Sequence, residues 1–61
     1  MFTEIVVIET GEIVSFRTQQ YSIGTYVIEN DDPECQYGIN MSEVDFHNEL
    51  RTNNAFKVLS Q

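Results

Sequence analysis

Basic residues, cysteine, glycine and proline are scarce in this 61-residue sequence, and tryptophan is absent. Three Lys and Arg residues stand against ten Asp and Glu residues, which gives a formal net charge of −7 at pH 7. Proteins that bind nucleic acid or anionic membranes need clustered Lys and Arg. The composition therefore argues against both classes, and we expect neither direct nucleic-acid binding nor membrane binding.

Long hydrophobic runs are also missing, and the longest one is Ile5 to Ile8. A signal peptide needs an apolar region of about 7–15 residues and a membrane-spanning helix needs about 20. The lone Cys35 excludes an internal disulfide framework, whereas secreted domains of this size are typically rich in disulfides. Together these absences predict a cytoplasmic protein.

Constellations that carry catalysis are not evident. Cys35 and His47 form the one Cys–His pair, and no orienting third residue stands at a recognisable spacing. The acidic run from Glu29 to Glu34 lacks the spacing of a calcium loop, and the three glycines are scattered singly. We therefore expect no enzyme activity, no cofactor and no metal site.

Stretches rich in β-branched and aromatic residues, separated by turn formers, predict several strands. Gly11 can take a positive φ and marks the first turn, Gln19-Gln20 is a weaker break, and Gly24 indicates a bulge or a close backbone approach. The expected strands are 2–9, 12–18, 21–29, 35–39 and 55–60.

One helix is predicted over about 43–52. Ser42 has the character of an N-cap, and Asp45 follows it by three residues in a box-like arrangement. Asn53-Asn54 supplies the stop, with one of the two expected in the left-handed conformation. The apolar residues that this helix offers to a sheet are Val44, Phe46 and Leu50.

These elements predict a single small α+β domain over 1–61. Its expected core is an antiparallel sheet of about three to five strands, with the helix packed on one face. A small barrel-like sheet with one helix is the alternative.

Both faces of the predicted sheet carry large apolar side chains, although one helix covers only one face. In the first strand Val6 and Ile8 oppose Ile5 and Val7. In the third, Tyr21, Ile23 and Val27 oppose Tyr26 and Ile28. The second face must be covered by the loop at 30–41, by curling of the sheet, by a second copy or by a different protein.

The acidic balance favours a binding role. We expect a small acidic regulator or inhibitor that occludes a partner's surface, such as an accessory protein of a virus or mobile element that blocks a host nucleic-acid-handling protein. The partner would be a protein with basic character. The alternative is a structural homo-oligomer or a small subunit of a larger assembly. The expected contact residues are Glu29, Asp31, Asp32, Glu34, Glu43, Asp45, Glu49, Tyr21 and Tyr26.

Overall fold

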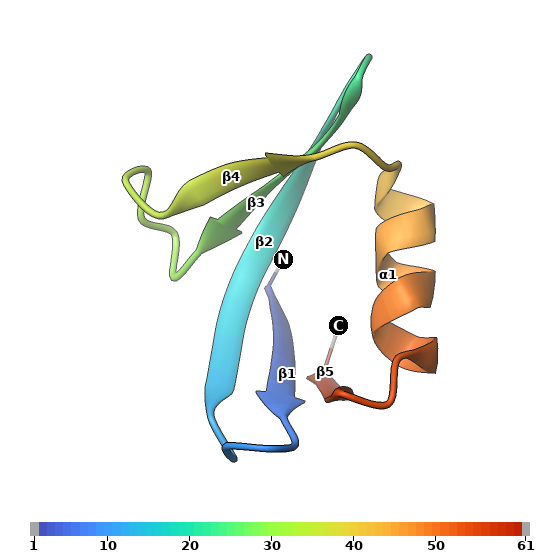
Figure 1. The fold of residues 1–61 in the computed structure, drawn as a ribbon. Coiled ribbons are helices and arrows are strands. Elements are labelled where there is room, and N and C mark those ends of the chain that lie inside the picture. Colours follow the sequence, from blue (N-terminus) through green and yellow to red (C-terminus); the bar gives the residue numbers. More distant parts are fainter. Residues whose placement is uncertain (1, 61) are drawn as a thin grey trace.

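The protein has a small α+β fold, in which one helix packs against a five-stranded antiparallel sheet (Figure 1). The computed structural model describes residues 2–60. The sheet is open, as the first expectation had it, and does not close into the barrel that was the alternative. Its elements are β1 (Thr3–Val7), β2 (Ile13–Tyr21), β3 (Gly24–Glu29), β4 (Gln36–Ile39), α1 (Glu43–Thr52) and β5 (Phe56–Ser60).

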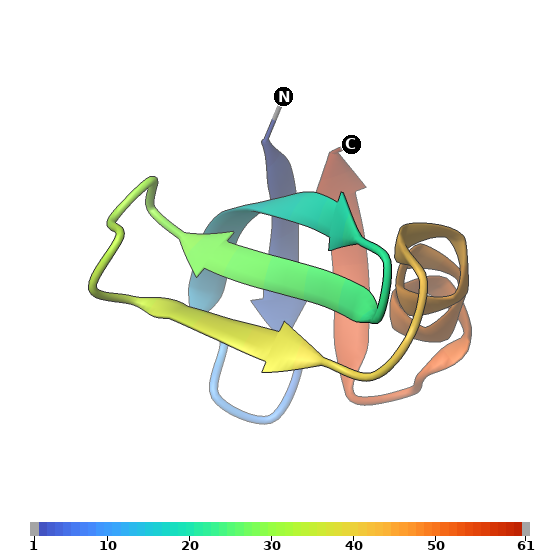
Figure 2. The same cartoon turned by 90° about the horizontal axis from the view of Figure 1, so that it is seen from above.

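The strand order is β4-β3-β2-β1-β5, so four strands form a meander and β5 returns beside β1. The long β2 belongs to both halves of the sheet, because its first part pairs with β1 and its second part pairs with β3. The two parts meet at Phe16, which is opposite Thr3 of β1 and opposite Glu29 of β3. Seen from above, β3 and β4 run across the direction of β1 and β5 (Figure 2). The sheet therefore curls around one face, which we call the inner face; the opposite one is the outer face.

The prediction of a break at Gln19-Gln20 is wrong. β2 continues to Tyr21, with Gln20 opposite Thr25, and the chain reverses at Ser22 and Ile23 instead. The Gln20 side-chain amide donates to the carbonyl oxygens of Tyr21 and Gly24 at 2.8 and 3.0 Å, which holds this hairpin end together. Ile23 lies at its tip and is 87 % exposed.

The close approach predicted at Gly24 is confirmed. A Cβ atom placed there would lie 2.4 Å from the carbonyl oxygen of Ile39, and the φ of Gly24 is 150°. Only a residue without a side chain allows the start of β3 to lie so near the end of β4.

The helix begins and ends as predicted. The Ser42 hydroxyl accepts a hydrogen bond from the Asp45 amide at 3.2 Å. The expectation for Val44 is wrong, because this residue is 70 % exposed. Phe46 and Leu50 lie one turn apart and face the sheet, whereas Val44 precedes Phe46 by two residues and points away.

The expected left-handed stop at Asn53 or Asn54 is also wrong. Asn53 is extended, with φ −81°, and its side-chain oxygen accepts from the Ala55 amide, so the chain passes directly into β5. Among the described non-glycine residues, positive φ occurs instead at Asn30 and Asp31, with values of 53° and 55°. These two residues form the turn that leaves β3, closed by the Asp32 amide donating to the Glu29 carbonyl.

The core lies between the inner face and α1. Its buried residues are Ile5, Phe16, Val27 and Leu50. The rings of Phe16 and Phe46 meet edge to face, with centroids 5.8 Å apart. In the part of the chain that is described, no helix is long and apolar enough to cross a membrane.

Candidate functional site

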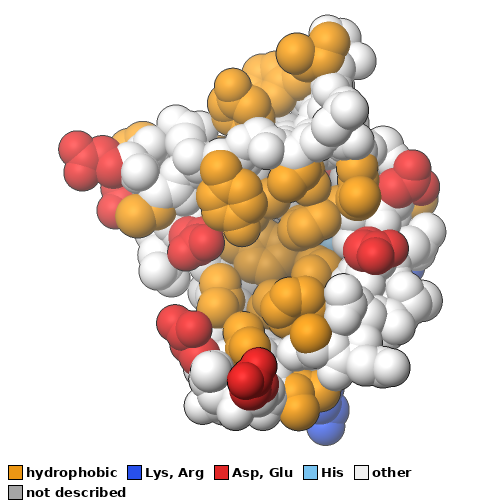
Figure 3. Space-filling view, in the orientation of Figure 1, with side chains coloured by type: hydrophobic (Ala, Val, Ile, Leu, Met, Phe, Trp, Pro, Cys, Tyr) orange, Lys and Arg blue, Asp and Glu red, His pale blue; other side chains and the backbone are white. Residues whose placement is uncertain are grey.

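The inner face holds an open apolar hollow, which we call the inner cleft. Its volume is about 210 Å³. Figure 3 shows it as a depression lined by hydrophobic side chains at the centre of the molecule. The lining residues are Ile5, Val7, Val14, Phe16, Val27, Glu29, Tyr37, Phe46, Leu50 and Phe56.

The curl of the sheet produces the inner cleft. β1, β2 and β3 supply its floor, α1 forms one wall, and Tyr37 of β4 stands at its margin. The wall is fixed through Gln20, whose side-chain oxygen accepts from the Glu43 amide at 2.7 Å. The Thr25 hydroxyl donates to the Met41 carbonyl at 2.8 Å, and Thr25 is 1 % exposed. The start of α1 is thereby tied to the sheet, which sets the position of the cleft wall.

Glu29 and Tyr37 are the polar members of the lining. Burial raises the pKa of the Tyr37 phenol, and the charge of the adjacent Glu29 carboxylate raises it further. Both effects favour the neutral phenol. Tyr37 remains 50 % exposed, so it presents an aromatic surface at the mouth of an apolar hollow.

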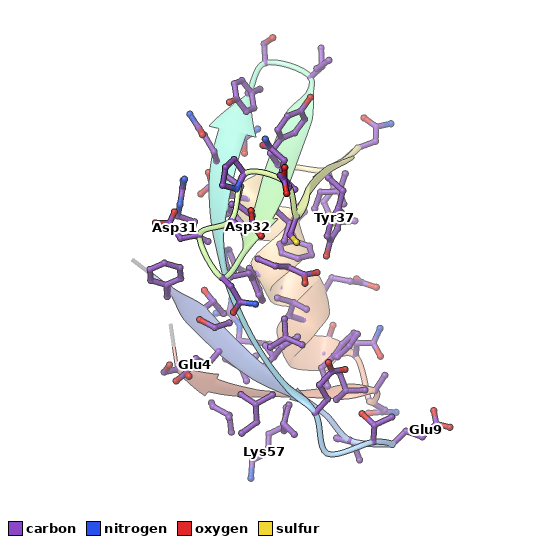
Figure 4. The ribbon with its side chains drawn as sticks, turned by 90° about the vertical axis from the view of Figure 1, so that its left-hand side faces the viewer. Glu4, Glu9, Asp31, Asp32, Tyr37 and Lys57 are labelled. Atoms are coloured by element: carbon purple, nitrogen blue, oxygen red, sulfur yellow. The ribbon has the colours of Figure 1, made fainter. Side chains whose placement is uncertain are left out.

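Carboxylates surround the hollow. Figure 3 shows acidic side chains on several sides of it, and basic ones only at the margins of the view. In Figure 4, Tyr37 and Glu9 lie on the side where the cleft opens, whereas Asp31 and Glu4 lie on the other side. The predicted acidic residues of α1 lie on the helix that forms one wall of the cleft. Glu43 is half-buried, and Asp45 and Glu49 are exposed.

The carboxylates of the acidic run from Glu29 to Glu34 differ in their surroundings. Asp31 pairs with the Arg17 guanidinium at 2.8 Å. Asp32 accepts from the Glu34 amide at 3.0 Å and from the Cys35 thiol at 3.5 Å, and this contact is the main cause that raises the pKa of Cys35. These carboxylates hold the loop in shape, and Glu29 is the member that reaches the inner cleft.

Tyr21 and Tyr26 lie together on the outer face, with ring centroids 5.0 Å apart. The expectation that they face opposite sides is wrong, because Tyr21 belongs to β2 rather than to β3. Gly38 beside them leaves room for the Tyr26 ring, since a Cβ there would lie 2.9 Å from a ring carbon. The predicted contact residues are therefore distributed over the loop, the helix and the outer face.

A second hollow of about 310 Å³ lies at the hairpin end, between Tyr21, Ile23, Tyr26 and the end of β4. Its apolar lining includes Ile23, the exposed residue at the hairpin tip. The inner cleft reaches buried core residues such as Phe16 and Val27, which are 2 % and 1 % exposed. The inner cleft is therefore the better-formed site.

A metal centre is not found among residues 2–60, where no group of three or more His, Cys, Asp and Glu side chains is placed to hold an ion. Cys35 is exposed in the loop before β4. His47 lies on α1 against the Phe46 ring, with centroids 5.7 Å apart.

Sequence reasoning did not identify the inner cleft or Tyr37 as a site. The alternation of β4 places Tyr37 and Ile39 on one face, and that signal was present. Curling of the sheet was expected as one way to cover its second face, but the hollow that the curl of β2 leaves on the inner face was not. Comparison with protein-family models, curated protein sequences and solved structures gave no match, so the function is argued from this geometry alone.

Proposed function

We propose that this chain is a protein-binding domain whose inner cleft receives an apolar side chain from a basic segment of another protein. The observation that carries the proposal is an apolar hollow that remains open on the inner face and has carboxylates around it. Exposed apolar surface with a polar rim is typical of interaction sites.

The size of the cleft favours a side chain over a free small molecule. Pockets for small molecules usually measure about 300–1,000 Å³. The inner cleft offers about 210 Å³ between Phe16, Phe46 and Phe56. An aliphatic or aromatic anchor of a partner would fill it, in the way that central anchors fill pockets at protein interfaces.

The charge of the chain favours a basic partner. The net charge is −7, and Glu29 lines the cleft itself. Opposite charges speed association and select against wrong partners. Segments rich in Lys and Arg are typical of proteins that handle nucleic acid, and covering such a segment would inhibit or regulate its owner. We place this action in the cytoplasm, where a lone cysteine stays reduced.

The test is a selection from randomised peptides of about 12 residues, displayed to the immobilised protein. We expect the enriched peptides to share an apolar residue flanked by Lys or Arg. Their affinity should fall at least several-fold between about 50 and 300 mM salt, because charge attraction is screened.

A matched pair of variants locates the binding site. Tyr37 and Tyr26 are 50 % and 44 % exposed, on the inner and the outer face respectively. Tyr37→Ala should weaken the selected peptides about 5- to 30-fold, as truncation of an aromatic interface residue commonly does. Tyr26→Ala should change the affinity less than about twofold. The reverse pattern, or enrichment of acidic peptides, would contradict the proposal.

A further inference from the structure

The sheet has two edge strands, β4 and β5, and of these β5 carries a charged residue, Lys57, whereas β4 carries none. β4 stands at one end of the strand order and lies outermost in Figure 2. The Glu29 amide donates to the Cys35 carbonyl. Since hydrogen-bonded pairs alternate along an antiparallel ladder, Tyr37 and Ile39 bond to β3. The backbone groups of Gln36 and Gly38 therefore point outward, where no strand among the described residues pairs with them.

Apart from its length of four residues, this edge lacks the usual protections. Natural sheets blunt exposed edges with charged residues, proline or bulges. The stretch from Gln36 to Ser42 carries no charge in a chain with ten acidic residues, and it contains no proline. Acidic residues stand at both ends of the stretch, Glu34 before it and Glu43 after it.

The edge and the inner cleft adjoin each other through Tyr37. This residue belongs to the edge strand and also lines the cleft. Figure 4 shows its side chain on the side where the cleft opens. A strand added beside β4 would extend the sheet on that side and direct alternate side chains toward the hollow.

We infer that the partner segment binds as an added strand, antiparallel or parallel to β4, with its alternate apolar side chains toward the inner cleft. This inference rests on the proposed function and specifies its binding mode. Main-chain hydrogen bonds to Gln36 and Gly38 supply affinity that is independent of sequence, and the cleft selects the apolar residues. Lys or Arg at the two ends of the segment would face Glu34 and Glu43.

Charge makes a second copy of this chain a poor occupant. Two copies would bring together net charges of −7 each, and like charges at an interface oppose association. A basic segment of another protein meets an uncharged edge between two acidic ends.

The probe is the peptide acetyl-Lys-Val-Lys-Phe-Lys-Val-Lys-amide, titrated into the isotope-labelled protein by NMR. Methylation of single peptide nitrogens tests the added strand. Methylation at alternate residues should weaken binding about 3- to 10-fold, the loss expected for one hydrogen bond. Methylation at the residues between them should change it less than twofold. A peptide with Glu in place of each Lys is the charge control and should not bind.

A protein variant tests the same bonds from the other side. Replacing the Gly38 amide with an ester removes one outward N–H and no side chain, and ligation at Cys35 makes this variant accessible by synthesis. We expect about 3- to 10-fold weaker binding. The ester also weakens the Tyr37 carbonyl as an acceptor from β3, so the melting temperature of the variant is measured beside its affinity to confirm that the fold is kept.

The outcomes separate the two claims. Loss of binding in Tyr37→Ala, together with no alternation in the methylation series and no effect of the Gly38 ester, would overturn the added strand and leave the cleft proposal standing. Failure of the peptide to perturb cleft residues at all would contradict the cleft proposal itself. A doubling of molecular mass without the peptide would show self-association and overturn the assignment of this edge to a partner.

Discussion

The two faces of the sheet carry comparable apolar side chains but differ in shape. On the inner face Val27 is 1 % and Tyr37 is 50 % exposed, and on the outer face Ile28 is 5 % and Tyr26 is 44 % exposed. The outer tyrosine rings pack against each other at an interplanar angle of 59°, and Gly38 leaves room for one of them. The inner residues surround a hollow that α1 covers only in part. Exposure of apolar residues alone thus does not distinguish the faces; the hollowing produced by the curl of β2 does.

The largest expected difference between the faces is in stability. Phe16→Ala removes a ring that is 2 % exposed, and such losses cost about 3–5 kcal/mol. A single core of this size supplies only about 3–5 kcal/mol in total, so the variant should be largely unfolded at room temperature. Ile13→Ala on the outer face, where Ile13 is 62 % exposed, should change stability by less than about 0.5 kcal/mol. Urea unfolding followed by circular dichroism measures both, and equal losses would contradict the assignment of the core.

Two glycines offer a smaller contrast. Gly24→Ala forces a Cβ against the Ile39 carbonyl and should cost about 1–3 kcal/mol or more, because the backbone must move where the start of β3 meets the end of β4. Gly11→Ala meets no atom within 4 Å and bears only the cost of its φ of 74°, about 1 kcal/mol. Thermal unfolding of the pair should rank Gly24→Ala as the less stable. The opposite ranking would mean that β3 and β4 are not in close approach there.

The ion pair of Arg17 with Asp31 should matter less than either glycine. Its side chains are 38 % and 62 % exposed, and pairs of this kind contribute about 0.2–1 kcal/mol. Arg17→Ala should lower the free energy of unfolding by no more than this at low salt, and by less in about 0.5 M salt. Asp31→Asn serves as the matched control, since it removes the charge from the other side and asparagine tolerates the positive φ of residue 31. A salt-independent loss would point to packing of Arg17 rather than to its charge.

The smallest effect concerns the pH dependence of the inner face. The pKa of Tyr37 in the fold lies above its ordinary value of 10.0, chiefly through burial. The folded state therefore favours the neutral phenol. Its contribution is fully present below the unfolded pKa and is lost as the pH rises through the folded pKa. Urea unfolding from about pH 8 to 11 should show a steeper loss of stability in the native protein than in Tyr37→Phe. Identical slopes would contradict the burial of this phenol.

Local features were predictable from sequence because local chemistry decides them. Ser42 and Asp45 predicted the start of the helix, and Gly24 predicted a close backbone approach. The end of β2 was not predictable, since the side chain of Gln20 stabilises the hairpin through contacts distant in sequence. Contacts between residues distant in sequence also form the inner cleft. They place Glu29 beside Tyr37 and Asp31 beside Arg17.

The central claim is that the inner face, not the outer face, binds a basic partner segment. The most direct measurement is an NMR titration of the isotope-labelled protein with acetyl-Lys-Val-Lys-Phe-Lys-Val-Lys-amide, followed by contacts between peptide and protein protons. We expect shifts and contacts at Phe16, Tyr37, Phe46 and Phe56 of the cleft lining. Shifts confined to Tyr21, Tyr26 and Ile13 would place binding on the outer face and contradict it.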